Sequence, residues 1–160
     1  MASDRKRVAF ATLGCKVNMY ETQAVAGMFR DRGYNVVEFE DPADVYVINT
    51  CSVTNAGARK SRQMIRRARR HNQCAVVVAM GCYCQSTTDE VTSMPEVNIV
   101  VGTHGRDRIV DLVERATETK QRINAVSPIA PVREYEEIAA TFAEGRTRAI
   151  IKVQDGCNEY

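Results

Sequence analysis

Three of the six cysteines occupy equivalent positions, each directly after a short apolar stretch that predicts a buried strand. Cys15 follows VAFATLG, Cys51 follows VYVINT and Cys82 follows AVVVAMG. Because the carboxyl ends of parallel strands meet at one edge of a sheet, we expect the three thiols to converge there. Three thiolates without a fourth suit a 4Fe-4S cluster that keeps one iron open, whereas a structural zinc site takes four ligands, usually from CxxC pairs that are absent here. The alternative is that all three are small buried apolar side chains.

The other three cysteines lie outside this pattern. Cys84 is two residues past Cys82, which is too close for an unstrained disulfide between them. Cys74 precedes its strand, at the end of the sheet opposite the predicted site, so we expect it to be structural or incidental. Cys157 follows a predicted strand at 146–153 and therefore lies again at a carboxyl end.

The elements that must position these thiols alternate between strand and helix. Continuous valine-rich strands predict a parallel sheet with helices on both faces, rather than a sheet with one face exposed to solvent. We expect a flavodoxin-like, doubly wound α/β fold with a parallel five-stranded sheet in the order 2-1-3-4-5. The segment 41–44 leaves little room for a helix between the second and third strands. The predicted strands are 8–14, 34–39, 45–49, 75–80 and 97–101, and the predicted helices are 18–32, 56–72 and 106–117.

The regular alternation of predicted strands and helices ends near residue 118, and we place the first domain at residues 1–118. Residues 119–145 contain Pro128 and Pro131 and show no sustained period, so they predict a linker. Residues 146–160 begin with a strand that has no partner in the sequence, and we expect them to be the first element of a further, truncated domain.

Composition narrows the class of protein. The chain has 160 residues, 44% hydrophobic and 26% charged, with a formal net charge of +2, which is a globular balance. No apolar run approaches the roughly 20 residues of a membrane span, and we expect no signal peptide. Cysteines without a secretion signal indicate a reducing compartment, and we expect a cytoplasmic protein. These observations exclude the membrane, secreted and fibrous classes.

The predicted helix at 56–72 carries seven basic residues within twelve positions and no acid among them. Like charges three and four residues apart repel each other along a helix, and an RNA phosphate backbone would relieve that repulsion. The alternative is an ordinary solvated helix face. The residues predicted to contact RNA are Lys60, Arg62, Arg66, Arg67 and Arg70.

Three ordered segments resemble the signature segments of the methylthiotransferase family: TLGCKVNMYET at 12–22, INTCSVTNAGARKSRQ at 48–63 and GCYCQ at 81–85. The Cys-Lys-Val-Asn form of the first segment is most similar to the branch that acts on N6-threonylcarbamoyladenosine in tRNA. The resemblance covers the whole chain and implies the amino-terminal part of a radical S-adenosylmethionine enzyme, followed by a barrel and an RNA-binding β domain.

The resemblance also implies site residues and cofactors. Cys15, Cys51 and Cys82 would hold a 4Fe-4S cluster whose open iron carries the sulfur to be transferred. Cys157, in KVQDGCNEY, resembles the first of three cysteines that hold a second, radical-generating cluster. The family replaces the C2 hydrogen of the adenine with a methylthio group, using S-adenosyl-L-methionine, a sulfur donor and tRNA. We expect a monomer that is inactive by itself in the full reaction, because the partners of Cys157 are missing.

Some alternatives stay open. GCYCQ carries Cys84 where the family usually has a small residue such as alanine, so this thiol could compete as a ligand. Asn18, Asn49 and Thr50 flank the cysteines and could either donate hydrogen bonds to sulfur or form turns and caps. The fold also permits a flavin- or cobalamin-binding module, although the first loop, Leu-Gly-Cys-Lys, is not a Ser/Thr/Gly-rich phosphate cradle. A third possibility is a structural domain with idle or oxidised thiols.

Overall fold

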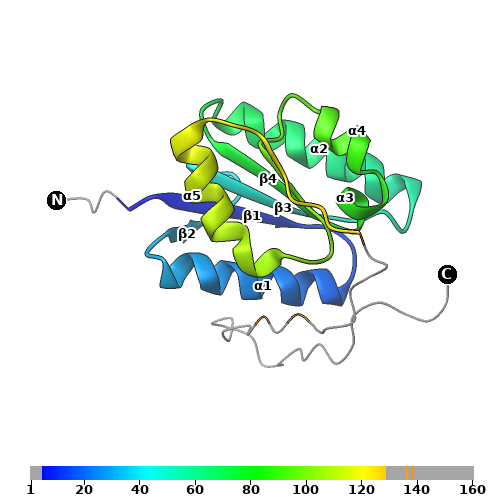
Figure 1. The fold of residues 1–160 in the computed structure, drawn as a ribbon, viewed down its shortest axis with the longest axis horizontal. Coiled ribbons are helices and arrows are strands. Elements are labelled where there is room, and N and C mark those ends of the chain that lie inside the picture. The colour runs from blue at the N-terminus through cyan, green and yellow to red at the C-terminus, as the bar shows by residue number, and fades with distance from the viewer. Residues whose placement is uncertain (1–4, 129–135, 137, 139–160) are drawn as a thin grey trace.

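The computed structural model describes residues 5–128 together with Glu136 and Ile138, and a parallel sheet forms the centre of this part of the chain (Figure 1). Its strands run in the order β2-β1-β3-β4-β5-β6, and every neighbouring pair is parallel. The strands are β1 (Arg7–Thr12), β2 (Asn35–Val37), β3 (Val45–Thr50), β4 (Val76–Gly81), β5 (Ile99–Val101) and β6 (Ile123–Asn124).

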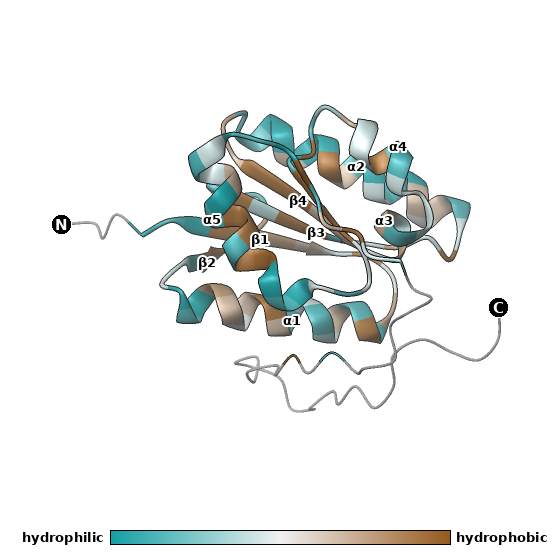
Figure 2. Ribbon diagram, viewed as in Figure 1, coloured by the Kyte–Doolittle hydropathy of each residue, from teal (hydrophilic) through white to brown (hydrophobic). Residues whose placement is uncertain are grey.

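Helices cover both faces of the sheet, and the apolar strands lie between them (Figure 2). One core packs the sheet against α2, α3 and α4, around Ile65, Tyr83 and Val91. The other packs it against α1 and α5, around Phe29 and Ile109. Burial on both faces explains why the strands are continuous apolar runs without alternation. The helices are α1 (Lys16–Asp31), α2 (Asn55–His71), α3 (Cys82–Ser86), α4 (Thr88–Ser93) and α5 (Ile109–Thr119), with a 3-10 turn η1 (Arg106–Arg108) before α5.

The predicted fold class and the order 2-1-3-4-5 are confirmed for the first five strands. The predicted number of strands was one short. The strand β6 lies within the segment predicted as a linker and pairs with β5, so the sheet extends past residue 118. The backbone N–H groups of Ile123 and of Ala125, the residue after β6, donate to Asn98 O and Val100 O, each at 2.8 Å. Two residues are too few to show a strand period, which is why the sequence did not reveal this strand.

The connection between β2 and β3 agrees with expectation, and the connection after β4 differs from it. No helix lies between β2 and β3, as predicted, and the side chain of Tyr46 holds this short link. Its hydroxyl accepts a hydrogen bond from Ala43 N at 3.1 Å and donates one to Asp41 O at 2.8 Å. The short helices α3 and α4, which follow β4, were not predicted, since five and six residues cannot display a helical period.

The predicted strand at 146–153 and Cys157 lie outside the described residues. Among the residues that are described, no helix is long and apolar enough to cross a membrane.

Candidate functional site

The structure brings Cys15, Cys51 and Cys82 to the carboxyl edge of the three central strands. Cys15 is the residue before α1, Cys51 directly follows β3, and Cys82 is the first residue of α3. Thr50 is paired in register with Gly81, so the positions after β3 and β4 lie side by side, and Cys15 follows Gly14, whose backbone lies against Cys51. All three thiols are free. We call this edge the cysteine edge.

The Cys82 thiol lies close enough to the other two thiols for their charges to affect its pKa. Burial is the largest cause that raises this pKa above its usual value. Glu21, Cys15 and Cys51 raise it further, because each places negative charge close to Cys82, and Arg106 opposes them. The thiols differ in exposure: Cys15 is exposed, Cys82 is half-buried and Cys51 is 8% exposed.

The approach of the first loop to Cys51 requires a glycine at position 14. Gly14 has a φ of +97°, and a Cβ added to it would lie 2.9 Å from Cys51 Cβ and 3.0 Å from Cys51 Sγ. A side chain would therefore separate the loop that carries Cys15 from the loop that carries Cys51. This glycine allows two of the thiols to share one site.

Amide side chains bind the loops to one another. Asn18 Nδ2 donates to Leu13 O at 2.7 Å and to Thr50 O at 3.1 Å, which joins the loops after β1 and β3. Asn49 Nδ2 donates to Asn18 O at 2.9 Å. The two amide groups therefore use their donors to join neighbouring segments of the backbone, and Asn49 Nδ2 also donates to Thr22 Oγ1 at 3.3 Å. The Cys15 thiol itself lies 3.8 Å from Asn18 Oδ1, as a donor.

Cys84 lies in the core and not at the cysteine edge. Its side chain is fully buried in the cluster under α2, with Tyr83 and Ile65, and its sulfur lies 3.5 Å from Thr50 Oγ1. Burial raises the pKa of this thiol to about 12. A buried thiol that holds its proton this firmly is a poor competitor for a metal. Cys74 is exposed and precedes β4, at the end of the sheet opposite the cysteine edge.

We predict that iodoacetamide modifies Cys15 and Cys74 of the folded chain within minutes and leaves Cys84 unmodified until urea unfolds the protein. The reason is access: Cys84 is fully buried, whereas the other two are exposed. Peptide mass spectrometry after a timed reaction measures all three sites in one sample. Modification of Cys84 at a rate comparable to that of Cys74, under native conditions, would contradict its placement in the core.

A buried ion cluster beside Cys82 was missed by sequence reasoning. Arg106 is 1% exposed and lies 2.5 Å from Glu21 Oε1, which belongs to a residue 5% exposed. Arg106 also meets Glu136, whose Oε2 lies 2.9 Å from both Nε and Nη2. The backbone N–H of Arg106 donates to Oε1 of the same carboxylate at 2.7 Å. The three residues are far apart in the sequence, so no local pattern could have revealed their contact.

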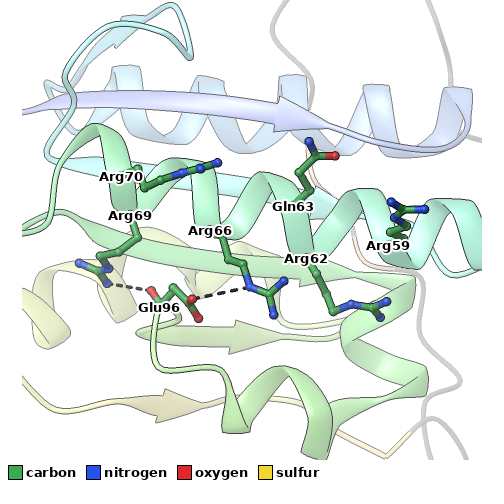
Figure 3. Close-up of a pocket in the computed structure, with 7 residues that line it drawn as sticks. All are labelled: Arg59, Arg62, Gln63, Arg66, Arg69, Arg70 and Glu96. Carbon is green, nitrogen blue, oxygen red and sulfur yellow. Dashed lines mark hydrogen bonds and ion pairs between the residues drawn. The ribbon is translucent and has the colours of Figure 1, made fainter.

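The basic helix α2 lines a groove of about 700 Å³ (Figure 3). Arg62, Arg66 and Arg70, which were predicted to contact RNA, line it, while Lys60 and Arg67 do not. Arg67 instead forms an ion pair with Glu40 at 2.5 Å. The full lining is Arg59, Arg62, Gln63, Arg66, Arg69, Arg70 and Glu96.

The donors at the cysteine edge suit a cluster better than a single ion. Within the part of the chain that the structure describes, no three His, Cys, Asp or Glu side chains are gathered tightly enough to hold one metal ion. The ligands of a 4Fe-4S cluster lie farther apart than those of one ion, because each binds a different iron. Three free thiols at one edge, with Gly14 leaving space beside Cys51, fit that wider arrangement.

Comparison with known proteins gives three findings. Residues 7–102 match the family described as "Uncharacterized protein family UPF0004". The chain is 50% identical over 153 residues to the threonylcarbamoyladenosine tRNA methylthiotransferase of Bacillus subtilis. This alignment covers 96% of the present chain and 34% of the relative. The chain is 41% identical over 154 residues to the enzyme of the same name from Aquifex aeolicus, covering 96% and 38%. The chain thus spans about a third of the length of these curated relatives.

A solved structure confirms the fold alone. The isolated REC domain of RcsB from Salmonella enterica serovar Typhimurium has a TM-score of 0.51 at 14% identity, covering 75% of this chain and 92% of that one. The family match extends over more than half of the chain, and the two relatives described above are methylthiotransferases. The chain therefore belongs to the methylthiotransferase family, through its UPF0004 domain.

Proposed function

We propose that this chain is the sulfur-donating part of a tRNA methylthiotransferase, which adds a methylthio group to C2 of N6-threonylcarbamoyladenosine. The observation that carries the proposal is the convergence of Cys15, Cys51 and Cys82 at one edge of the sheet. The two relatives named above support the tRNA substrate, since both are described as threonylcarbamoyladenosine tRNA methylthiotransferases. S-adenosylmethionine, a sulfur donor and tRNA would be the partners of the whole protein.

The three cysteines would hold a 4Fe-4S cluster, and the chain's own residues position them. When bound, such a cluster supplies one open iron at which a sulfur atom can be held for transfer. The Cys51 backbone N–H donates to the buried Ser61 Oγ at 3.2 Å, and Ser61 Oγ donates to Gly57 O at 2.9 Å. The loop that carries Cys51 is thus fixed to the first turns of α2. Cys82 is fixed by the strand β4 that precedes it and by the helix α3 that it begins.

The proposal predicts how much iron the chain takes up. Anaerobic reconstitution with iron and sulfide should give about four irons per chain, with the Mössbauer signature of a 4Fe-4S cluster. The Cys15→Ala/Cys51→Ala/Cys82→Ala variant should lose nearly all of it, because every protein ligand is removed. Iron analysis and Mössbauer spectroscopy of both proteins measure the effect.

The matched control is Cys74→Ala/Cys84→Ala, which removes the two other described thiols and should keep its iron. Iron content that falls equally in the control and in the triple variant would count against a cluster held by Cys15, Cys51 and Cys82. A wild-type chain that binds no iron would contradict the proposal for this chain.

A further inference from the structure

The groove along α2 concentrates positive charge on a protein that is nearly neutral. Its lining holds five arginines and one glutamate, a formal charge of +4, whereas the whole chain carries +2. The groove lies on the face of the sheet covered by α2 and α4, away from α1 and α5 (Figure 1). This uneven distribution suggests a polyanionic partner for one face of the molecule.

Three of these arginines are exposed and make weak ion pairs or none that the structure records among the described residues. Arg59 and Arg70 are exposed. The side chain of Arg66 is 59% exposed, and its Nε lies 3.8 Å from Glu96 Oε1. Because the arginine is exposed and the distance is long, this pair contributes well under about 1 kcal/mol although Glu96 is half-buried, so an incoming phosphate can replace the glutamate.

Arg69 also lines the groove, but its guanidinium is occupied by hydrogen bonds within the protein and is not available to a ligand. Its guanidinium donates to the backbone carbonyls of Gln73, Ala75 and Glu96 and to Asn98 Oδ1, at 2.6 to 2.8 Å. These hydrogen bonds hold the last turns of α2 against the connection into β5 (Figure 3). The exposed arginines therefore project from a helix that is fixed in place.

The exposed arginines follow one another along the helix at intervals of three and four residues, together with Arg62 and Gln63. Positions at these intervals share one face of a helix, so the row extends for about 16 Å between Arg59 and Arg70 at 1.5 Å per residue. The row begins close to the cysteine edge, since α2 is capped by Thr54, three residues after Cys51. A chain of phosphates bound along it would lead toward the cysteines.

We propose that this groove binds the phosphate backbone of RNA, with Arg59, Arg66 and Arg70 as the principal residues that meet it. Guanidinium groups match phosphate oxygens in two-point hydrogen bonds, and a straight row of them matches a regular series of phosphates. That the RNA is tRNA rests on the function proposed above; that the groove binds an RNA backbone rests on its own charge and geometry.

The test is RNA binding by the chain without iron, measured as fluorescence anisotropy of a labelled tRNA transcript at several salt concentrations. The groove variant is Arg66→Glu/Arg70→Glu. The matched control is Arg115→Glu/Arg30→Glu on α5 and α1, which changes the net charge equally. Arg30 and Arg70 both lie in the last turn of their helices, so the two variants also perturb helix ends alike.

We expect the groove variant to raise the Kd about ten-fold or more at low salt, and the control to raise it less than about three-fold. The slope of log K against log salt should fall by about one for each phosphate that the variant no longer neutralises. The milder Arg66→Gln/Arg70→Gln variant, with unchanged circular dichroism, should give an intermediate weakening of binding, which excludes unfolding as the cause.

Several results would overturn the assignment: equal weakening in the groove variant and its control, no RNA binding by the wild-type chain at low salt, or stronger groove-dependent binding of polyglutamate than of RNA. The last would indicate an acidic protein partner. Because the chain carries no iron in this test, groove-dependent binding together with a failed reconstitution would overturn the proposed function and leave the groove assignment intact.

Discussion

Replacing Arg106 by methionine should lower the free energy of unfolding by about 3–5 kcal/mol. Arg106 is almost completely buried between two carboxylates, those of Glu21 and Glu136. Methionine keeps much of the volume but leaves the Glu21 carboxylate buried without its cation. A change of this size is a large part of the roughly 5–15 kcal/mol that stabilises a typical domain. Urea unfolding followed by circular dichroism measures it.

Arg32 provides the matched control, because it also bridges two carboxylates but does so at the surface. Its guanidinium lies 2.7 Å from Asp111 and 2.7 Å from Glu114, and its side chain is 48% exposed. Arg32→Met should cost much less than Arg106→Met, since water solvates the two carboxylates in place of the guanidinium. The Glu21→Gln/Arg106→Met variant should recover part of the stability that Arg106→Met removes. Equal costs for the two arginines would show that burial does not determine the strength of the cluster.

The cysteine edge was predictable because each contributing signal is local. A run of buried residues followed by Gly-Cys or Thr-Cys marks a strand and the residue that leaves it, as at Cys82 and Cys51. The parallel arrangement then places these residues together without further information. The same reasoning placed Cys74 at the opposite end of the sheet, where the structure has it.

The features of the site that could not be predicted from the sequence depend on interactions between residues far apart in the chain. Nothing near Glu21 indicates that its carboxylate meets Arg106, because a glutamate on a helix is ordinarily solvated. The basic residues of α2 look alike in the sequence, yet Arg69 binds backbone carbonyls and Arg67 pairs with Glu40, while Arg70 stays exposed. Which arginine can meet a phosphate is decided by its neighbours in space.

Replacing Gly81 by alanine should destabilise the chain by about 2–6 kcal/mol, for two separate reasons. Gly81 has a φ of +102°, which costs an alanine roughly 1–3 kcal/mol of backbone strain. Its Cβ would also lie 2.5 Å from Asn49 Oδ1 and 2.8 Å from Thr50 O. Since Thr50 O belongs to the backbone of the neighbouring strand, the clash cannot be relieved by rotating a side chain, and such overpacking costs about 1–3 kcal/mol more. Urea unfolding of the variant measures the total.

Gly33→Ala is a control that lacks the clash. Gly33 also has a positive φ, +86°, but a Cβ added there would meet nothing within 4 Å. Its alanine variant should therefore show backbone strain without a clash. The Gly81 backbone, with φ +102° and ψ −161°, lies in a region that is essentially restricted to glycine, so the larger cost expected for Gly81→Ala contains both the clash and this additional strain. Equal costs would mean that β3 and β4 separate easily at this point. Because Gly81 directly precedes Cys82, a shift that relieves the clash would move this thiol away from Cys51, and Gly81→Ala should lose iron on reconstitution while Gly33→Ala keeps it.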